Sequence, residues 1–153
     1  WLRIFTYLER QIVSKVSSTS DFIRLKDYAH LMMSKAYAPY SKFSVGAALL
    51  TDCQKIFGGC NVENAAYPQG MCAEAGAISA MIAGGGSILK TICVISQSKK
   101  IISPCGGCRQ KIREFSNQET KIYLLNIKDE IKVFSVEELL PFSFSEFDSL
   151  KKE

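Results

Sequence analysis

The chain has 153 residues, 47% hydrophobic and 22% charged, which is typical of a globular protein with one buried core. No apolar run reaches the roughly 18 residues that a membrane-spanning helix needs, and Arg3, Glu9 and Arg10 interrupt the opening segment where a signal peptide would be apolar. The net charge of +4 comes from scattered basic residues, not from the longer basic stripe of a nucleic-acid groove. We therefore expect a cytoplasmic protein that binds neither membranes nor nucleic acid.

The hydrophobic pattern predicts helices and strands that alternate along one domain. Residues 1–19 run into the cluster SSTS and are expected to form an N-terminal extension, followed by a single domain over residues 20–153. Helices are predicted at residues 21–37, 71–86, 103–115 and 135–142. Strands are predicted at residues 43–52, 55–63, 90–98, 120–126 and 131–136. This order predicts an α/β fold, a three-layer α/β/α sandwich with a central five-stranded mixed sheet.

Local signals mark the ends of several predicted helices. Asp21 is a candidate cap for the first helix, which Pro39 stops. Ser103 is the candidate cap of the third helix, with proline next in its first turn. Ser135 and Glu138 have the spacing of a capping box at the start of the last helix.

Six cysteines could in principle form three disulfides. We expect no export signal, and the cysteines are clustered; both points argue against that pairing. Cys105 and Cys108 are separated by two residues, a spacing typical of metal or redox sites. The others outside the motifs are expected to be buried or incidental thiols: Cys53, Cys60 and Cys93. The single histidine, His30, is expected to be an ordinary helix residue.

Two predicted helix starts carry the residues with the clearest chemistry, Cys72-Ala73-Glu74 and Cys105-Gly-Gly-Cys108. Cysteines three apart lie on one helical face and can reach one ion. Residues two apart diverge by about 200° in a regular helix, so Cys72 and Glu74 can share a site only at the helix end. At that end the free N–H groups and the helix dipole favour the thiolate form of cysteine.

Three thiolates with one open position are typical of a catalytic zinc site. A carboxylate at Glu74 would then lie beside the activated water and could carry its proton. A structural Cys₄ site would need a second C-x-x-C pair, but Ala75 stands three residues after Cys72. A redox pair and a non-catalytic, zinc-stabilised binding module are the alternatives from another class.

Three longer strings resemble the small, homotetrameric zinc-dependent cytidine deaminases. They are AYAPYSKFSVGAALL at residues 36–50, GGCNVENAAYPQGMCAEAGAI at residues 58–78 and SPCGGCRQ at residues 103–110. The likeness runs from about residue 21 to residue 140, and together the three strings are highly specific. It implies hydrolytic deamination of cytidine and deoxycytidine, one Zn²⁺ per chain and a homotetramer whose active sites borrow residues across subunits.

The resemblance also assigns roles to individual residues. The implied zinc ligands are Cys72, Cys105 and Cys108, with Glu74 as the proton shuttle. The implied nucleoside contacts are Asn61 and Glu63 at the ribose, Phe43 at the pyrimidine face, Tyr67, the Ala73 backbone at the base carbonyl, and the Ser103 carbonyl at the departing amine. Several of these have simpler interpretations. Asn61 and Glu63 could be turn residues, Phe43 a core residue and Tyr67 a packing or subunit contact.

Two other substrate classes remain open, namely another cytosine-bearing compound and a cytosine within nucleic acid. The implied ribose pair of Asn61 and Glu63 argues against both.

The sequence departs from the resembled family at the position after Glu74. The family commonly has an arginine there that binds the zinc thiolates, whereas this chain has Ala75. Helix N–H groups and Arg109 are the candidate groups to offset the thiolate charge here.

Overall fold

The computed structural model describes residues 19–145, and its centre is a five-stranded sheet in the order β2-β1-β3-β4-β5. The strands are β1 Val45–Thr51, β2 Ile56–Cys60, β3 Leu89–Ser96, β4 Ser116–Leu125 and β5 Ile131–Phe134. Strand β1 is antiparallel to both of its neighbours, β2 and β3. Strands β3 and β4 are parallel, and β5 is antiparallel to β4. The sheet is therefore mixed, as predicted.

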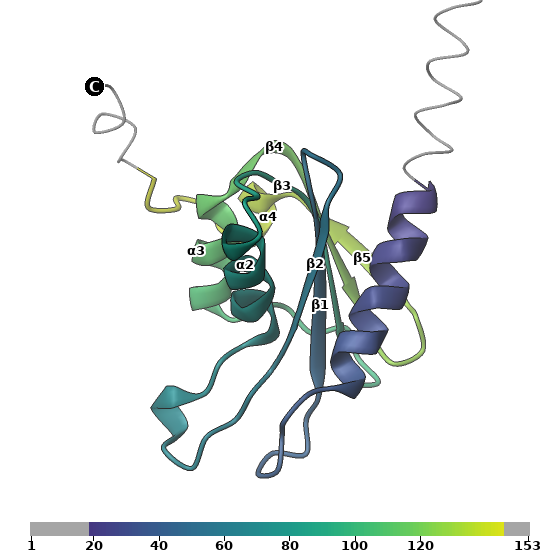
Figure 1. Cartoon of the computed structure of the whole chain (residues 1–153), viewed down its shortest axis with the longest axis vertical. Coiled ribbons are helices and arrows are strands. Elements are labelled where there is room, and N and C mark those ends of the chain that lie inside the picture. The colour runs from purple at the N-terminus through teal and green to yellow at the C-terminus, as the bar shows by residue number, and fades with distance from the viewer. Residues whose placement is uncertain (1–18, 146–153) are drawn as a thin grey trace, which may run out of the picture.

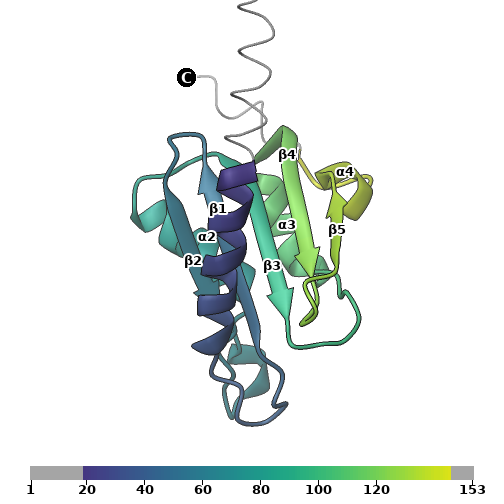
Figure 2. The ribbon, with the colours of Figure 1, turned by 90° about the vertical axis from the view of Figure 1, so that its right-hand side faces the viewer.

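Helices cover both faces of this sheet (Figures 1 and 2). A helix over residues 19–34, drawn in purple, packs on one face. The other face carries α2 (Ala73–Ala83), α3 (Gly106–Glu114) and the short α4 (Val136–Leu139). A 3-10 turn, η1 (Tyr67–Gln69), precedes α2. Among residues 19–145, no helix has the length and apolar character needed to cross a bilayer.

The sandwich has a separate apolar core on each face of the sheet. Strand β1 contributes to both, because successive side chains of a strand point to opposite faces. Ala47 and Leu49 pack with α2 and α3, whereas Ala48 and Leu50 pack with the helix over residues 19–34. All four side chains are at most 1% exposed. This double burial confirms the predicted three-layer architecture.

Several predicted helix ends are corrected by the structure. The first helix already includes residues 19 and 20, so Asp21 is not its cap and instead pairs with Arg24 at 3.5 Å. The same helix ends at residue 34, because Tyr37 leaves it to form a parallel bridge with Val62. Residues 1–18 of the predicted extension lie outside the described residues.

The other two predicted caps have different outcomes. The cap of α3 is Cys105 and not Ser103, because the Cys105 backbone is still extended (φ −63°, ψ 162°) and the first helical residue is Gly106. The predicted capping box at the start of α4 is confirmed, with Glu138 N–H donating to Ser135 Oγ at 3.2 Å and Ser135 N–H donating to the Glu138 carboxylate at 2.7 Å.

Helix α2 lies unusually close to strand β2, and Gly59 makes that approach possible. A Cβ atom built on Gly59 would lie 2.3 Å from the Ala77 nitrogen and 2.5 Å from the Ala73 oxygen, both backbone atoms of α2. A Cβ on Gly76, across the same contact, would be 3.6 Å from its nearest neighbour, an ordinary van der Waals distance. Gly59 therefore fixes how deeply the N-terminal half of α2 sits on the sheet.

We expect Gly59→Ala to lower the free energy of unfolding by about 1–3 kcal/mol, because backbone atoms must move to accept the methyl group. Gly76→Ala is the matched control in the same contact, and it should be neutral or stabilising by up to about 1 kcal/mol, since alanine favours the helix. Urea titrations of the two variants measure both changes. Equal stability of the two variants would contradict this account of the packing.

Candidate metal centre

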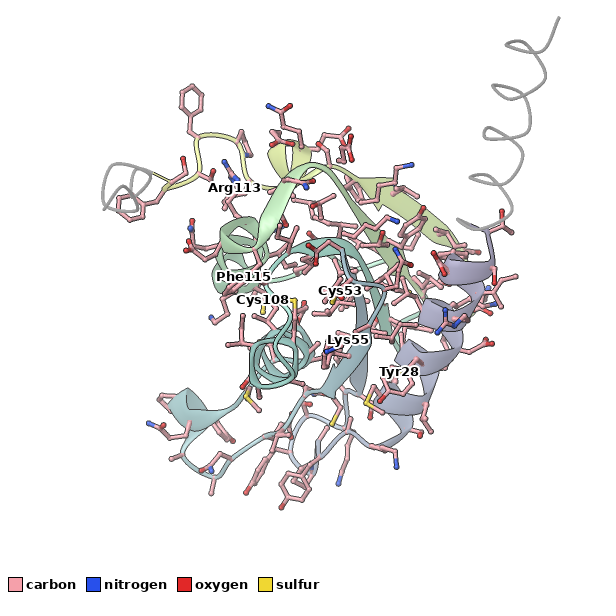
Figure 3. All side chains as sticks on the ribbon, turned by 45° about the horizontal axis from the view of Figure 1, so that its top comes forward. Tyr28, Cys53, Lys55, Cys108, Arg113 and Phe115 are labelled. Atoms are coloured by element: carbon pink, nitrogen blue, oxygen red, sulfur yellow. The ribbon has the colours of Figure 1, made fainter. Side chains whose placement is uncertain are left out.

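The three cysteines of the two sequence motifs meet at one point of the structure. Cys72 is the N-cap residue of α2 and Cys105 is the N-cap residue of α3. Cys108 lies in the first turn of α3, within the layer that α2 and α3 form (Figure 3). The three Sγ atoms lie within 4.8 Å of one another, and the Cys72 and Cys105 sulfurs are 3.9 Å apart. The predicted convergence of the two motifs is confirmed.

The direction of two strands explains why these helix starts are neighbours. Strands β2 and β3 both run antiparallel to β1, so they point the same way. Helix α2 is the next α-helix after β2, and α3 is the next α-helix after β3. Both helices therefore begin at the same end of the sheet, where the strands have their carboxyl ends (Figure 1).

The electrostatics of the cluster favour a bound cation. Burial raises the pKa of the Cys72 thiol, and burial together with the Glu74 carboxylate raises that of Cys108. Burial acts in the same direction on Cys105, but hydrogen bonds from the Cys108 backbone and from both neighbouring thiols outweigh it and lower its pKa. A cation would stabilise all three groups as thiolates. Three soft sulfur donors that converge on one point suit zinc.

Glu74 lies beside the thiols, in the first turn of α2, and only 5% of its surface is exposed. The Cys108 thiol donates a hydrogen bond to Glu74 Oε2 at 3.4 Å. A buried carboxylate must be neutralised or paired, and a cation held by the neighbouring thiols would pair with it. The structure thus places the Glu74 carboxylate against the cysteine cluster and not at the surface.

A second group of residues, predicted to contact the nucleoside, lies in two loops beside the metal centre, at the lower end of the sheet in Figure 1. Glu63 accepts hydrogen bonds from the Tyr40 N–H at 2.9 Å, from the Ser41 N–H at 3.2 Å and from the Ser41 hydroxyl. The Ser41 hydroxyl bond is the main cause that lowers the pKa of Glu63. No local sequence signal marks Tyr40 or Ser41, because only the folded loops bring them to Glu63.

These residues line a pocket of about 410 Å³ formed by Tyr40, Ser41, Glu63, Asn64, Tyr67 and Gly70. Tyr67 is 76% exposed, and its ring meets the Tyr40 ring edge-on at 6.0 Å between centroids. A larger cavity of about 930 Å³ lies between the helix over residues 19–34 and strands β3, β4 and β5, and no cysteine lines it. The small pocket is the one that contains predicted nucleoside contacts.

Asn61 and Phe43 are coupled directly. The Asn61 amide donates to the Phe43 carbonyl at 2.8 Å and accepts from the Val45 N–H at 2.8 Å. Asn61 therefore fixes the backbone of Phe43, whose side chain is half-buried. An amide side chain has further hydrogen-bonding capacity after these two bonds, so a ligand contact is compatible with this anchoring role.

The remaining predicted residues flank the metal ligands. Ala73, fully buried, is the first residue of α2, and Ser103 is exposed just before α3. The Arg109 guanidinium, considered above as a partner for the thiolates, instead donates to three oxygen atoms, on Ser103, Pro104 and Leu139. The Cys108 backbone N–H, together with the Cys108 and Cys72 thiols, lowers the pKa of Cys105.

Comparisons with known proteins agree with this geometry. Residues 20–124 match the family model for the cytidine and deoxycytidylate deaminase zinc-binding region. The chain is 45% identical over 114 residues to a cytidine deaminase of Sporosarcina psychrophila, covering 74% of this chain and 84% of the relative. A crystal structure of cytidine deaminase from Burkholderia pseudomallei superimposes with a TM-score of 0.75 at 41% identity, covering 79% of this chain and 97% of that one. A cytidine deaminase from Mycobacterium tuberculosis gives 0.71 at 34% identity, covering 82% and 98%.

We expect about one zinc ion per chain, and Cys105→Ser should lose most of it because two thiolates hold the ion much less tightly than three. Cys53→Ser is the matched control, since Cys53 is an exposed thiol in the turn after β1, outside the cluster. Elemental analysis after dialysis against a mild chelator measures the zinc content. Full zinc content in the Cys105 variant would show that this thiol is not a ligand.

Proposed function

The chain belongs to the cytidine and deoxycytidylate deaminase family, and from that membership we propose that it hydrolyses cytidine and deoxycytidine to uridine and deoxyuridine with release of ammonia. The observation that carries this proposal is the convergence of three thiols with a buried carboxylate at two helix starts. Such a reaction serves pyrimidine salvage, and its partner is a small nucleoside rather than a nucleic acid or a membrane.

Zinc is held by Cys72, Cys105 and Cys108, and when bound it supplies Lewis-acid activation of the attacking water. Glu74 then handles the protons. Its carboxylate takes a proton from the water that adds to C4 of the pyrimidine and passes it to N3 of the ring. Glu74 then moves the remaining proton from the oxygen now bonded to C4 to the exocyclic nitrogen, the C4–N4 bond breaks, and ammonia leaves while that oxygen becomes the C4 carbonyl. Because the Glu74 side chain is buried, its carboxylate is kept from exchanging these protons with bulk solvent.

The nucleoside is held by the loops beside the metal centre. Glu63 and Asn61 bind ribose hydroxyls, Phe43 packs on the pyrimidine, and Tyr67 closes the sugar side of the pocket. The Ala73 backbone contacts the base carbonyl, and the Ser103 carbonyl accepts a hydrogen bond from the departing amine. The pocket that contains both Glu63 and Tyr67 supports this arrangement, as does the bond through which Asn61 holds Phe43.

Glu74→Gln should keep its zinc and its fold but lose about 10²- to 10⁴-fold in kcat, because the amide cannot carry the proton. Glu119→Gln, which changes an exposed carboxylate on β4, should match the wild type. Ammonia release from cytidine measures both. Near-normal turnover by the Glu74 variant would show that Glu74 is not the proton-transfer group. If the wild type released ammonia from cytosine in single-stranded DNA but not from cytidine, the proposed substrate would be contradicted.

Glu63→Gln should lower kcat/KM for cytidine far more than for free cytosine, because only the nucleoside has ribose hydroxyls to lose. Ser41→Ala is the control for the loop itself, since it removes the hydroxyl that binds Glu63 but leaves the carboxylate in place. Steady-state kinetics with both substrates separate the two roles. An equal loss on cytidine and cytosine would mean that Glu63 acts only by holding the loop.

A homotetramer is the proposed assembly, with residues shared across subunits at the active sites. Support comes from apolar side chains exposed beside the pocket, namely Tyr37, Tyr40, Val62, Tyr67 and Met71, each at least 39% exposed. Val62 forms backbone bridges with both Tyr37 and Met71, and the Tyr40 and Tyr67 rings meet each other; exposed apolar side chains that gather in one region are of the kind that marks protein interfaces. Light scattering should give about four times the 17.0 kDa chain mass, and a monomer would refute the tetramer.

The proposed protein has one deaminase domain with an N-terminal extension and is located in the cytoplasm. The family match over residues 20–124 supports a deaminase domain at residues 20–153 preceded by an extension at residues 1–19. All six cysteines are free thiols in the structure, and a zinc site of three thiolates needs its cysteines reduced. A reducing compartment provides that condition, which supports a cytoplasmic location.

A further inference from the structure

The turn between β3 and α3 contains one metal ligand, and a single side chain spans it. Arg109, half-buried on α3, donates from Nε to the Pro104 carbonyl at 2.9 Å and from Nη2 to Ser103 Oγ at 2.8 Å. Its backbone N–H donates to the Cys105 carbonyl at 3.0 Å. The Arg109 side chain thus binds the two residues that precede Cys105, and the backbone bond to Cys105 is the first bond of the helix, which any residue at position 109 would keep.

The same guanidinium also reaches a different element. Its Nη1 donates to the Leu139 carbonyl at 2.9 Å, at the end of α4. Leu139 is only 7% exposed and belongs to the core beneath α2 and α3. The turn is therefore tied through Arg109 to a fixed point of the core. The guanidinium donates to three neutral oxygen atoms, two backbone carbonyls and one hydroxyl. These bonds therefore need the planar fork of arginine and not merely its charge.

We propose that Arg109 is a positioning residue that holds the Ser103–Cys105 turn, and with it the Cys105 sulfur and the Ser103 carbonyl, in register with Cys72 and Cys108. The expected effect on the metal rests on the cluster of Cys72, Cys105 and Cys108. The effect on turnover rests on the proposed deaminase function, because it acts through the Ser103 carbonyl and the metal. Displacing a group by about 1 Å at an active site can cost 10²-fold in rate.

Arg113 offers a control that distinguishes the positioning role of Arg109 from a general contribution to the stability of the fold. Arg113 lies one turn further along α3, where the helix meets the C-terminal segment (Figure 3), and its Nε donates to Ser143 Oγ at 3.0 Å. Gln110 donates to the Phe144 carbonyl of the same segment at 2.9 Å. These bonds fasten the C-terminal segment to α3 without reaching the turn, so Arg113→Ala is the matched control for Arg109→Ala.

The test compares zinc release to a colorimetric chelator, and kcat and KM for cytidine, in the wild type, Arg109→Ala, Arg109→Lys and Arg113→Ala. We expect Arg109→Ala to release zinc about 10- to 100-fold faster and to lose a similar factor in kcat, with KM changed less than about threefold. Arg109→Lys keeps the charge but not the fork, and should also release zinc at least about fivefold faster. Arg113→Ala should stay within about twofold of the wild type.

Zinc release by Arg109→Ala within about twofold of the wild type would overturn the proposal, and so would an equal loss in Arg113→Ala. If Arg109→Ala does not fold, Arg109→Lys decides in the same way, and release at the wild-type rate would overturn the proposal. Zinc release needs no substrate. A wild type that fails to deaminate cytidine would therefore contradict the proposed function while leaving the role of Arg109 measurable.

Discussion

The metal centre depends on the direction of two strands that never touch each other. Strands β2 and β3 flank β1 and run antiparallel to it. Their shared direction places the starts of α2 and α3 at one end of the sheet, so that cysteines 33 residues apart come within 3.9 Å. A parallel pairing of β1 with either neighbour would send one helix start to the opposite end, and the three thiols could not share an ion.

Close packing then gives the site its chemistry. Gly59 lets the first turns of α2 approach the strand backbone, and Glu74 in that turn is buried against Cys108. Burial makes an unpaired carboxylate and unpaired thiolates costly, so that each group needs the cation that the others help to bind. The fold and the cysteine cluster thus depend on the same packing contact.

Much of this site could be predicted from the sequence because its signals are local. The spacing of Cys105 and Cys108, and the pairing of Cys72 with Glu74 at a helix start, indicate one ion before any tertiary contact is known. The capping box of Ser135 and Glu138 is local in the same way. The predicted Ser103 cap was wrong because helix α3 begins only after the proline, at the metal ligand itself.

The remaining features depend on tertiary structure. The bonds from Tyr40 and Ser41 to Glu63 join loops more than 20 residues apart, so no local pattern indicates them. Arg109 follows a metal ligand in sequence, which suggested a contact with sulfur. Side chains on a helix lean toward its N-terminus, however, and this one extends back across the preceding turn to carbonyl and hydroxyl oxygens.

The central claim is that three thiolates from two helix starts bind one zinc and leave a position open for chemistry. Zinc K-edge X-ray absorption of the purified protein tests it most directly. The account predicts three sulfur ligands at about 2.3 Å and one lighter ligand at about 2.0 Å. Substituting Cys105 should reduce the sulfur count. Four sulfur ligands, or a shell without sulfur, would contradict the account.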